Sequence, residues 1–226
     1  METNEKAMKT KVYNLVILDK SGSMESIRKE AVDGYNETLG TIRAAQIKHM
    51  DTQEHFVSLA AFCGCGIEMI YDKTPIQEAD KLRPEQYEPC CMTPLYDAIG
   101  KTIKKLKKDI QDDADAAVLV TIITDGCEND SKEWTGAAIK KLVEECKEEG
   151  WMFAFIGAGE EVVKEATTIS ITNTIVWEKS SAGTEAMFCE TNDASTRFFD
   201  KMAMCDACAS VDERRQMRKK FSEEYY

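Results

Sequence analysis

The chain has 226 residues, 43% of them hydrophobic, which is enough to bury the core of one α/β domain. Its 29 basic and 41 acidic residues give a formal charge of −12, which argues against generic binding to nucleic acid or to an anionic membrane. No apolar run reaches the roughly 18 residues of a membrane span, and residues 1–11 are polar, so we expect neither a membrane segment nor a signal region in this sequence.

The first predicted element is a buried parallel strand at residues 12–18. This apolar stretch is rich in Val, Ile and Leu, which is typical of a strand that is covered on both faces. A helix is predicted at about 25–48, and two strands at about 55–63 and 66–72 follow it. The tight turn Gly64-Cys65-Gly66 between these strands predicts an antiparallel hairpin at one edge of the sheet.

Strands and helices alternate through the rest of the chain. Asp130 and Glu133 have the spacing of a capping box, which predicts that a helix begins at about residue 131, and Gly150 ends it. In chain order the remaining predicted elements are a helix at 94–110, a strand at 117–124, a helix at 131–149, a strand at 151–157, a short helix near 160–168, a strand near 173–177 and helical sequence from about 184 onward.

This alternation predicts an α/β fold with a doubly wound, mostly parallel six-stranded sheet, one antiparallel edge strand and helices on both faces. We expect a single domain over residues 1–226, with its core at about 11–177 and a C-terminal helical segment at about 178–226. Residues 183–209 have few strong apolar repeats, which suggests a loosely docked C-terminal segment.

Three polar side chains alternate directly after the first predicted strand, namely Asp19, Ser21 and Ser23. An extended backbone has a period of two and points all three the same way, and Gly22 allows the turn to be tight. Carboxylate and hydroxyl oxygens are hard donors that suit a divalent cation. Because ligands bind at the carboxyl ends of the strands in open α/β sheets, a metal site is predicted at this edge.

One carboxylate and two hydroxyls are too few ligands for such an ion, and the chain offers two more. Thr93 precedes Pro94 and an amphipathic helix, so we predict that it is the N-cap of that helix, with its hydroxyl at the junction between loop and helix. Asp125 follows the strand at 117–124, and its carboxylate emerges at the same edge if the two strands are parallel neighbours.

These motifs, in this order, resemble the von Willebrand factor type A domain, which is Rossmann-like and carries a metal-ion-dependent adhesion site (MIDAS). The resemblance covers about residues 11–177. It implies that Ser21, Ser23 and Thr93 contact the ion directly. It also implies that Asp19 and Asp125 hold the ion largely through water. The stretches 18–24, 93–98 and 150–157 are also similar to a bacterial and phage-borne branch of stand-alone type A domains.

The donor set favours recognition over catalysis. Two carboxylates and three neutral hydroxyls leave a divalent ion under-neutralised, with a position that an Asp or Glu carboxylate of a protein partner would fill. We expect Mg²⁺, because it retains several waters and uses few carboxylates, with Mn²⁺ and Ca²⁺ as alternatives. The sequence therefore predicts a non-enzymatic, metal-dependent protein-binding domain with neither a nucleic-acid nor a membrane partner.

A metal-dependent hydrolase or phosphatase at the same site is the main alternative. A haloacid-dehalogenase-like phosphatase also has an Asp after its first strand, but it needs a second carboxylate where this chain has Ser21. Histidine-based catalysis has only His49 and His55 available, both near the start of the second predicted strand and remote from Asp19. Hydrolysis by metal-activated water stays open, although no general base beyond the metal ligands is evident.

A zinc or redox module built on the nine cysteines is a third hypothesis. The odd count and the closely spaced pairs argue against a disulfide framework and favour a reduced, cytoplasmic setting. The close pairs are Cys63 with Cys65 and Cys90 with Cys91. Cys205 and Cys208 have the spacing of half a zinc site. A complete site is expected to require this tail to reach the loops with the close pairs, so buried or idle thiols are the simpler interpretation.

Overall fold

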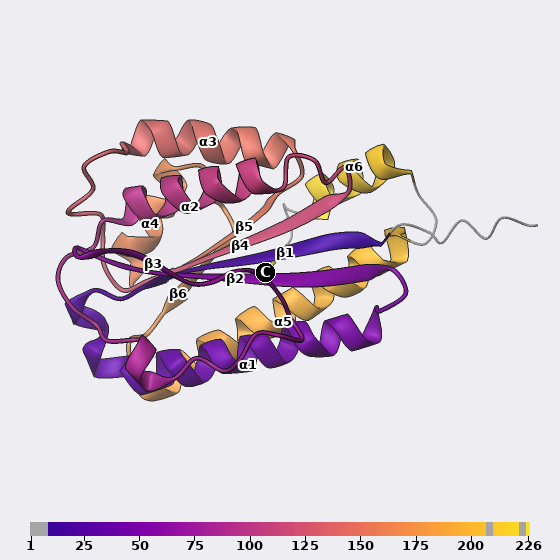
Figure 1. Ribbon diagram of the computed structural model, residues 1–226. Coiled ribbons are helices and arrows are strands. Elements are labelled where there is room, and N and C mark those ends of the chain that lie inside the picture. Colours follow the sequence, from indigo (N-terminus) through magenta and orange to yellow (C-terminus); the bar gives the residue numbers. More distant parts are fainter. Residues whose placement is uncertain (1–8, 207–209, 222–224) are drawn as a thin grey trace, which may run out of the picture.

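The computed structural model describes residues 9–206, 210–221 and 225–226, and it contains a six-stranded sheet covered by helices on both faces (Figure 1). The strands are β1 (Thr10–Asp19), β2 (Gln53–Cys63), β3 (Gly66–Pro75), β4 (Ala116–Thr124), β5 (Met152–Ala158) and β6 (Thr174–Trp177). The described α-helices are α1 (Arg28–Lys48), α2 (Leu95–Asp109), α3 (Gly136–Glu148), α4 (Glu160–Thr168), α5 (Ser181–Asp206) and α6 (Val211–Phe221), and short 3-10 helices lie at Gly22–Ile27 and Pro84–Gln86.

The strand order is β3-β2-β1-β4-β5-β6, and every pair is parallel except β2 with β3. The predicted sheet, with its antiparallel edge strand, is therefore confirmed. β1 lies between β2 and β4, so the chain leaves it in one direction toward β2 and later returns to its other side. Such a reversal of strand order creates a crevice at the carboxyl ends of the strands, where ligands bind in this class of sheet.

Two hydrophobic clusters cover the two faces of the sheet. Alternate residues of β1 enter opposite clusters: Val16 and Leu18 lie in one, and Leu15 and Ile17 in the other. The first cluster lies under α1 and α5, and the second lies under α2, α3 and α4 (Figure 1). Burial on both faces explains why β1 is apolar from Leu15 to Leu18 without alternation.

α5 packs firmly along α1, so the expectation of a loosely docked C-terminal segment was wrong. Phe188 is only 2% exposed, and it occupies the space that a side chain at Gly34 of α1 would need. Thr191 and Ser195 interrupt the apolar pattern of α5, which is why the sequence did not predict its close packing on α1. Both hydroxyls donate to carbonyls one turn earlier in the helix, so these polar residues are buried without an unsatisfied group.

Two predicted helix starts were wrong. α3 begins at Gly136, and its N-cap is Thr135, whose hydroxyl accepts a hydrogen bond from the Ala138 N–H at 3.3 Å. The predicted capping box does not form, because the Glu128 and Asp97 carboxylates accept the backbone N–H groups of residues 130, 131 and 132–134 and hold this segment as a loop. The first predicted helix starts as the 3-10 helix Gly22–Ile27 and becomes α-helical at Arg28.

α6 is attached to the start of β4 by buried ion pairs. The Asp115 carboxylate forms ion pairs with the guanidinium groups of Arg218, at 2.7 Å, and of Arg214, at 3.1 Å. Arg218 is only 4% exposed. Cys208 lies outside the described residues. Among the helices within residues 9–206 and 210–221, none has the length and apolarity to cross a bilayer.

Candidate metal centre

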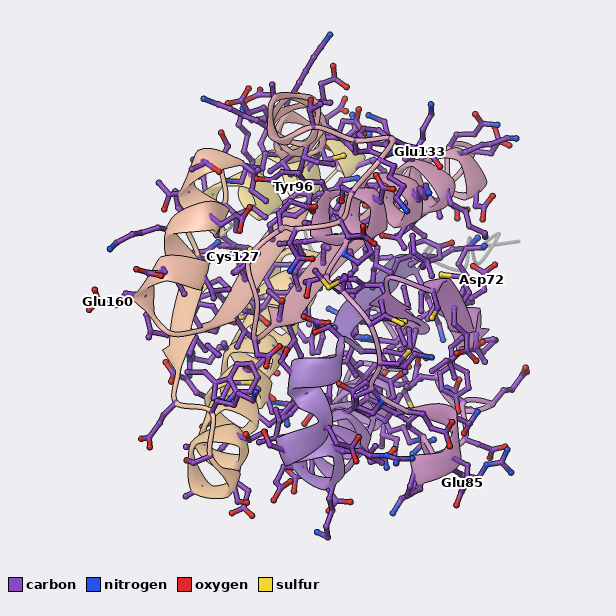
Figure 2. All side chains as sticks on the ribbon, turned by 90° about the vertical axis from the view of Figure 1, so that its left-hand side faces the viewer. Asp72, Glu85, Tyr96, Cys127, Glu133 and Glu160 are labelled. Atoms are coloured by element: carbon purple, nitrogen blue, oxygen red, sulfur yellow. The ribbon has the colours of Figure 1, made fainter. Side chains whose placement is uncertain are left out.

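The five predicted oxygen donors come from three loops at the carboxyl edge of the sheet. Asp19 ends β1, Ser21 and Ser23 lie in the following turn, Thr93 precedes α2, and Asp125 follows β4. Figure 2 views the molecule from this edge, with Cys127 labelled on the loop that leaves β4 and Tyr96 labelled in the first turn of α2. The fold therefore brings residues that are up to 106 positions apart to one edge, because β1 and β4 are hydrogen-bonded neighbours.

Asp19 is fully buried, and both of its carboxylate oxygens accept hydrogen bonds from neutral groups. Oδ1 accepts from the Ser21 N–H at 2.6 Å, and Oδ2 accepts from the Thr124 hydroxyl at 2.6 Å. Burial raises the pKa of Asp19 to about 6, although these hydrogen bonds oppose the rise. A charge in this environment is incompletely compensated by dipoles, so a nearby cation would stabilise it.

A chain of hydrogen bonds links the two serines to Asp125. The Ser21 and Ser23 hydroxyl oxygens are 3.1 Å apart, and the Ser23 hydroxyl donates to Asp125 Oδ1 at 2.7 Å. Ser21 has an extended backbone, with φ −68° and ψ 161°, but the 3-10 helix that begins at Gly22 includes Ser23, so the predicted extended alternation ends at Ser21. Ser21 is buried while Ser23 is exposed, and the group is therefore open to solvent on one side.

Thr93 lies against the glycine that follows Asp125. A Cβ placed on Gly126 would come within 3.2 Å of the Thr93 hydroxyl oxygen, so the absence of a side chain lets the two loops approach. The predicted helix-capping role of Thr93 was wrong, because Pro94 occupies the N-cap position and α2 begins at Leu95. Thr93 is fixed instead through its backbone, which exchanges two hydrogen bonds with Asn129, at 2.8 and 3.2 Å.

Two residues support the site through contacts that the sequence did not predict. Glu128 accepts the backbone N–H of Tyr96 at 2.8 Å and of Ser131 at 2.7 Å, which ties the loop after β4 to the start of α2. The Tyr87 hydroxyl donates to the Asp19 carbonyl and holds the end of β1. An acid two residues after the Thr124-Asp125-Gly126 motif, or a tyrosine in a proline-rich loop, has no local pattern that indicates such a contact.

Lys179 brings a positive charge to the site, and nothing in the sequence predicted it. Its ammonium nitrogen lies 2.7 Å from Asp125 Oδ2 and donates to the Ser23 carbonyl. Lys179 lies in the turn between β6 and α5, so its position depends on the last parallel strand of the sheet. The site therefore already attracts and holds one cation, at the carboxylate that faces the two serines.

The donor set fits a hard divalent ion. All five predicted groups offer oxygen, none offers nitrogen or sulfur, and Asp19 has no charged partner among its hydrogen-bonding groups. The two histidines are far away, as predicted: His55 pairs in register with Val12, near the opposite end of β1, and His49 contacts Asp200. The arrangement is suited to holding an ion near solvent.

No protein-family model matches this sequence, and no curated protein is significantly similar to it. Solved structures do share its fold. The pilus adhesin SpaC from Lactobacillus rhamnosus GG has a TM-score of 0.61 at 15% identity, over 85% of this chain and 30% of that chain. Proximal thread matrix protein 1 from the mussel byssus, with a zinc-occupied MIDAS motif, has a TM-score of 0.59 at 15% identity, over 83% of this chain and 48% of that chain.

Manganese-loaded TRAP protein from Plasmodium vivax is a third similar structure, with a TM-score of 0.50 at 15% identity, over 79% of this chain and 71% of that chain. These proteins contain von Willebrand factor type A domains, so the chain has the type A fold that its motifs resemble. It spans only 30% of the adhesin and 48% of the byssus protein.

Proposed function

We propose that this chain is a divalent-metal-dependent protein-binding domain, in which a metal-ion-dependent adhesion site docks an Asp or Glu carboxylate of a partner. The observation that carries the proposal is the hydrogen-bonded group of Ser21, Ser23 and Asp125 beside the buried Asp19 carboxylate, at the strand edge where type A folds bind ligands. The metal-loaded sites of the byssus protein and of TRAP support it.

In this proposal Ser21, Ser23 and Thr93 contact the ion, and Asp19 and Asp125 hold it largely through water. The bound ion supplies a positive charge with a position free for an outside oxygen. Mg²⁺ suits this set best, since neutral hydroxyls and few carboxylates match an ion that keeps part of its water shell. A partner carboxylate would add the negative charge that the three hydroxyls do not provide.

We propose binding rather than catalysis as the role of this site. The byssus protein and the pilus adhesin are named for matrix and adhesion roles, and His49 and His55 lie away from the donors. The proposal also includes a reducing, cytoplasmic setting, which the nine cysteines favour, and membership of the bacterial and phage-borne stand-alone branch, which the stretches 18–24, 93–98 and 150–157 suggest.

Calorimetric titration of Mg²⁺ into chelator-treated protein tests the metal centre. We expect one saturable site in the wild type, abolished in Asp19→Ala and in the double variant Ser21→Ala/Ser23→Ala. Ser26→Ala, which changes an exposed serine in the same 3-10 helix, is the matched control and should bind normally. Circular dichroism must show that the variants are folded. Equal Mg²⁺ binding by all the variants would contradict the site.

Selection from a displayed peptide library tests carboxylate docking separately. Peptides are captured in Mg²⁺, eluted with chelator and resynthesised with each Asp or Glu replaced by Asn or Gln. One acidic residue should be indispensable in each peptide, and binding should require both Mg²⁺ and Ser21 with Ser23. Peptides that bind equally well after these replacements would contradict carboxylate docking while leaving the metal centre intact.

A further inference from the structure

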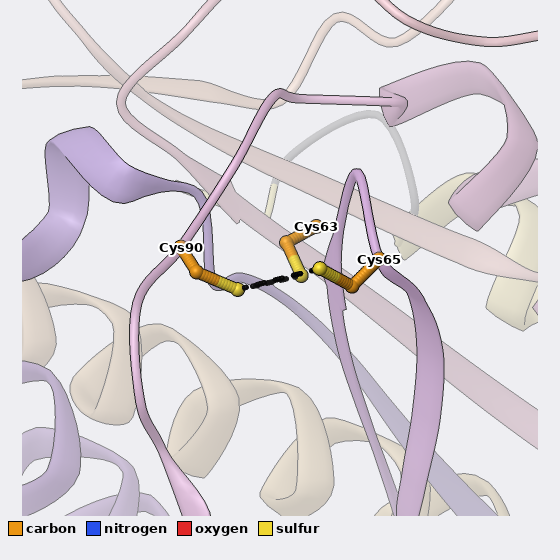
Figure 3. A group of neighbouring side chains, drawn as sticks. All are labelled: Cys63, Cys65 and Cys90. Atoms are coloured by element: carbon orange, nitrogen blue, oxygen red, sulfur yellow. Dashed lines mark hydrogen bonds between the residues drawn. The ribbon is translucent and has the colours of Figure 1, made fainter.

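Four cysteines from two distant segments come together beside the metal centre. Cys63 ends β2 and Cys65 lies in the turn to β3, while Cys90 and Cys91 lie in the loop before α2. Figure 3 shows the thiols of Cys63, Cys65 and Cys90 pointing toward one another from the hairpin and from this loop. None of the cysteines that the structure describes forms a disulfide.

Three of the four sulfur atoms are separated by the distances of a common coordination sphere, and the fourth contacts one of them. Cys90 Sγ lies 3.4 Å from Cys63 Sγ and 3.8 Å from Cys65 Sγ, and Cys65 Sγ lies 3.1 Å from Cys91 Sγ. The sulfurs of Cys63, Cys65 and Cys90 all lie within 4.8 Å of one another. In a tetrahedral zinc site with Zn–S bonds of about 2.3 Å, adjacent sulfurs are about 3.8 Å apart.

Backbone hydrogen bonds hold the two segments in place. The Gly64 N–H donates to the Met92 carbonyl at 2.8 Å, and the Cys90 N–H donates to the Lys20 carbonyl at 2.8 Å. The Gly22 N–H donates to the Cys91 carbonyl at 3.1 Å. The thiols are thus positioned by main-chain contacts that do not depend on any bound ion, and a preorganised ligand set binds metal more tightly than a flexible one.

A bound metal holds its cysteine ligands as thiolates, so a positive side chain near the cluster would offset their negative charge. Lys20 adjoins the cluster, because its carbonyl accepts the Cys90 N–H at 2.8 Å, and its ammonium nitrogen lies 2.8 Å from Glu68. Its ammonium group would offset part of the negative charge of a zinc–thiolate centre.

We propose that Cys63, Cys65 and Cys90 form a thiolate site for a soft divalent cation, best matched by Zn²⁺, with the Cys91 thiol beside Cys65 as the fourth ligand. On binding, each ligating thiol releases its proton to solvent and donates an electron pair from sulfur to the metal, with no change in oxidation state. An open groove of about 370 Å³, lined in part by Cys63, Cys65 and Asp130, provides a path from solvent. This site is additional to the proposed oxygen-ligated centre and does not rest on it.

Cys205, in the C-terminal tail that the sequence suggested such a module would need, lies away from the four thiols. Cys205 lies near the end of α5, beyond Phe199, whose carbonyl accepts a hydrogen bond from the side chain of Gln53 at the start of β2. Cys63 lies at the other end of the same strand. The hairpin and the loop before α2 therefore supply the four thiols by themselves.

One common site is favoured over two separate disulfides. Disulfides would pair Cys63 with Cys90 and Cys65 with Cys91, but Cys90 also contacts Cys65, so the two pairs are not independent. A reduced setting, which the odd cysteine count favours, leaves the thiols available to a metal.

Titration of Co²⁺ and Cd²⁺ into metal-free, reduced full-length protein tests the proposal, because thiolate ligation gives a sulfur-to-metal charge-transfer band that oxygen ligation does not give. We expect one equivalent of each metal to produce the band and Zn²⁺ to displace Co²⁺. Cys65→Ser and Cys90→Ser, which change thiols that are not buried, should lose the band. Cys189→Ser, at an exposed thiol on α5, is the matched control and should keep it.

Asp19→Ala separates the two centres, since the byssus protein shows that zinc can occupy an oxygen-ligated site. Retention of the band in Asp19→Ala, with its loss in Cys65→Ser and Cys90→Ser, supports the thiolate site. Reduced wild-type protein that gives no charge-transfer band would overturn it, whether or not disulfides form on oxidation. Metal binding that Asp19→Ala alone abolishes would overturn it too.

Discussion

Asp19 carries a buried charge that neutral hydrogen-bond donors balance only in part. Burial raises its pKa from 3.8 to about 6, so between these values the folded protein binds a proton that the unfolded chain does not. The resulting contribution to stability is fully present below about pH 4 and is lost as pH rises through about 6. Above that pH the charged side chain destabilises the metal-free protein.

We therefore predict that Asp19→Asn abolishes Mg²⁺ binding yet stabilises the chelator-treated protein at pH 8. An asparagine oxygen can still accept the Ser21 N–H, and its amide can donate to the Thr124 hydroxyl oxygen. A pKa difference of about two units corresponds to about 3 kcal/mol, so we expect a gain of roughly 1–3 kcal/mol. Urea unfolding at several pH values measures it. A difference between variant and wild type that does not shrink toward pH 4 would contradict this account.

Lys179 competes with a metal ion for Asp125, because its ammonium nitrogen lies 2.7 Å from the same carboxylate. We predict that Lys179→Met tightens Mg²⁺ binding about three- to tenfold, which corresponds to roughly 1 kcal/mol. Lys179→Arg keeps the charge and is the matched control. Calorimetric titration at fixed ionic strength compares the Mg²⁺ affinities of the two variants with that of the wild type. Weaker binding by Lys179→Met would show that the ammonium group supports the site instead.

At the scale of the elements, the loop that follows β4 and Asp125 is tied to α2 and to Thr93 before it. Glu128 and Asp97 accept the backbone N–H groups of the loop after β4, and Asn129 holds the backbone of Thr93. These side chains replace the regular hydrogen bonds of a helix, so residues 130–134 keep their place without secondary structure. Thr93, which precedes α2, is thereby held relative to Asp125.

The contact between α1 and α5 makes a second element-scale prediction, in which two glycines of one helix respond oppositely to alanine. A Cβ at Gly34 would lie 1.9 Å from Phe188 Cδ2, whereas a Cβ at Gly40 would have no atom within 4 Å. Gly40→Ala should stabilise the protein by about 0.5–1 kcal/mol through helix propensity. Gly34→Ala should destabilise it by about 1–3 kcal/mol through overpacking. Urea unfolding compares the two, and equal stabilisation would contradict the close packing of α5.

For the whole molecule, the charge of −12 opposes the approach of an acidic partner. The attraction at the proposed metal centre acts locally, because charges separated by more than about 8 Å are largely screened at physiological ionic strength. Docking should therefore depend on the fit around the ion rather than on long-range attraction.

The contrast between long-range repulsion and local attraction at the proposed metal centre predicts how salt changes the rate of binding. The association rate constant of a selected acidic peptide should rise as KCl is added at constant free Mg²⁺, because screening weakens the overall repulsion. Stopped-flow fluorescence measures it, with a version of the peptide made neutral outside its indispensable acid as the control. A rate constant that falls with added salt would indicate that attraction, not repulsion, dominates the approach.

Local patterns in the sequence were sufficient to predict the sheet and the edge of it at which the five oxygen donors lie. A buried strand followed by alternating Asp19, Ser21 and Ser23, and a second strand followed by Asp125, needed only hydrophobic periodicity and the rule that ligands bind at the carboxyl ends of parallel strands. The roles of these side chains as ligands remain a prediction. The same local reasoning failed at Thr93 and at the start of α3, where distant side chains supply the hydrogen bonds.

Only the tertiary structure placed Lys179 on Asp125, Phe188 against Gly34, and Cys63 beside Cys90. Each of these contacts joins segments whose proximity depends on strand order and helix docking, and a side chain's neighbours across such distances leave no periodic pattern in the chain. Sequence by itself determined which residues end the strands, because backbone geometry and apolar burial act over a few residues. The fold decided which of those ends meet, because contacts between distant segments depend on the packing of the whole sheet.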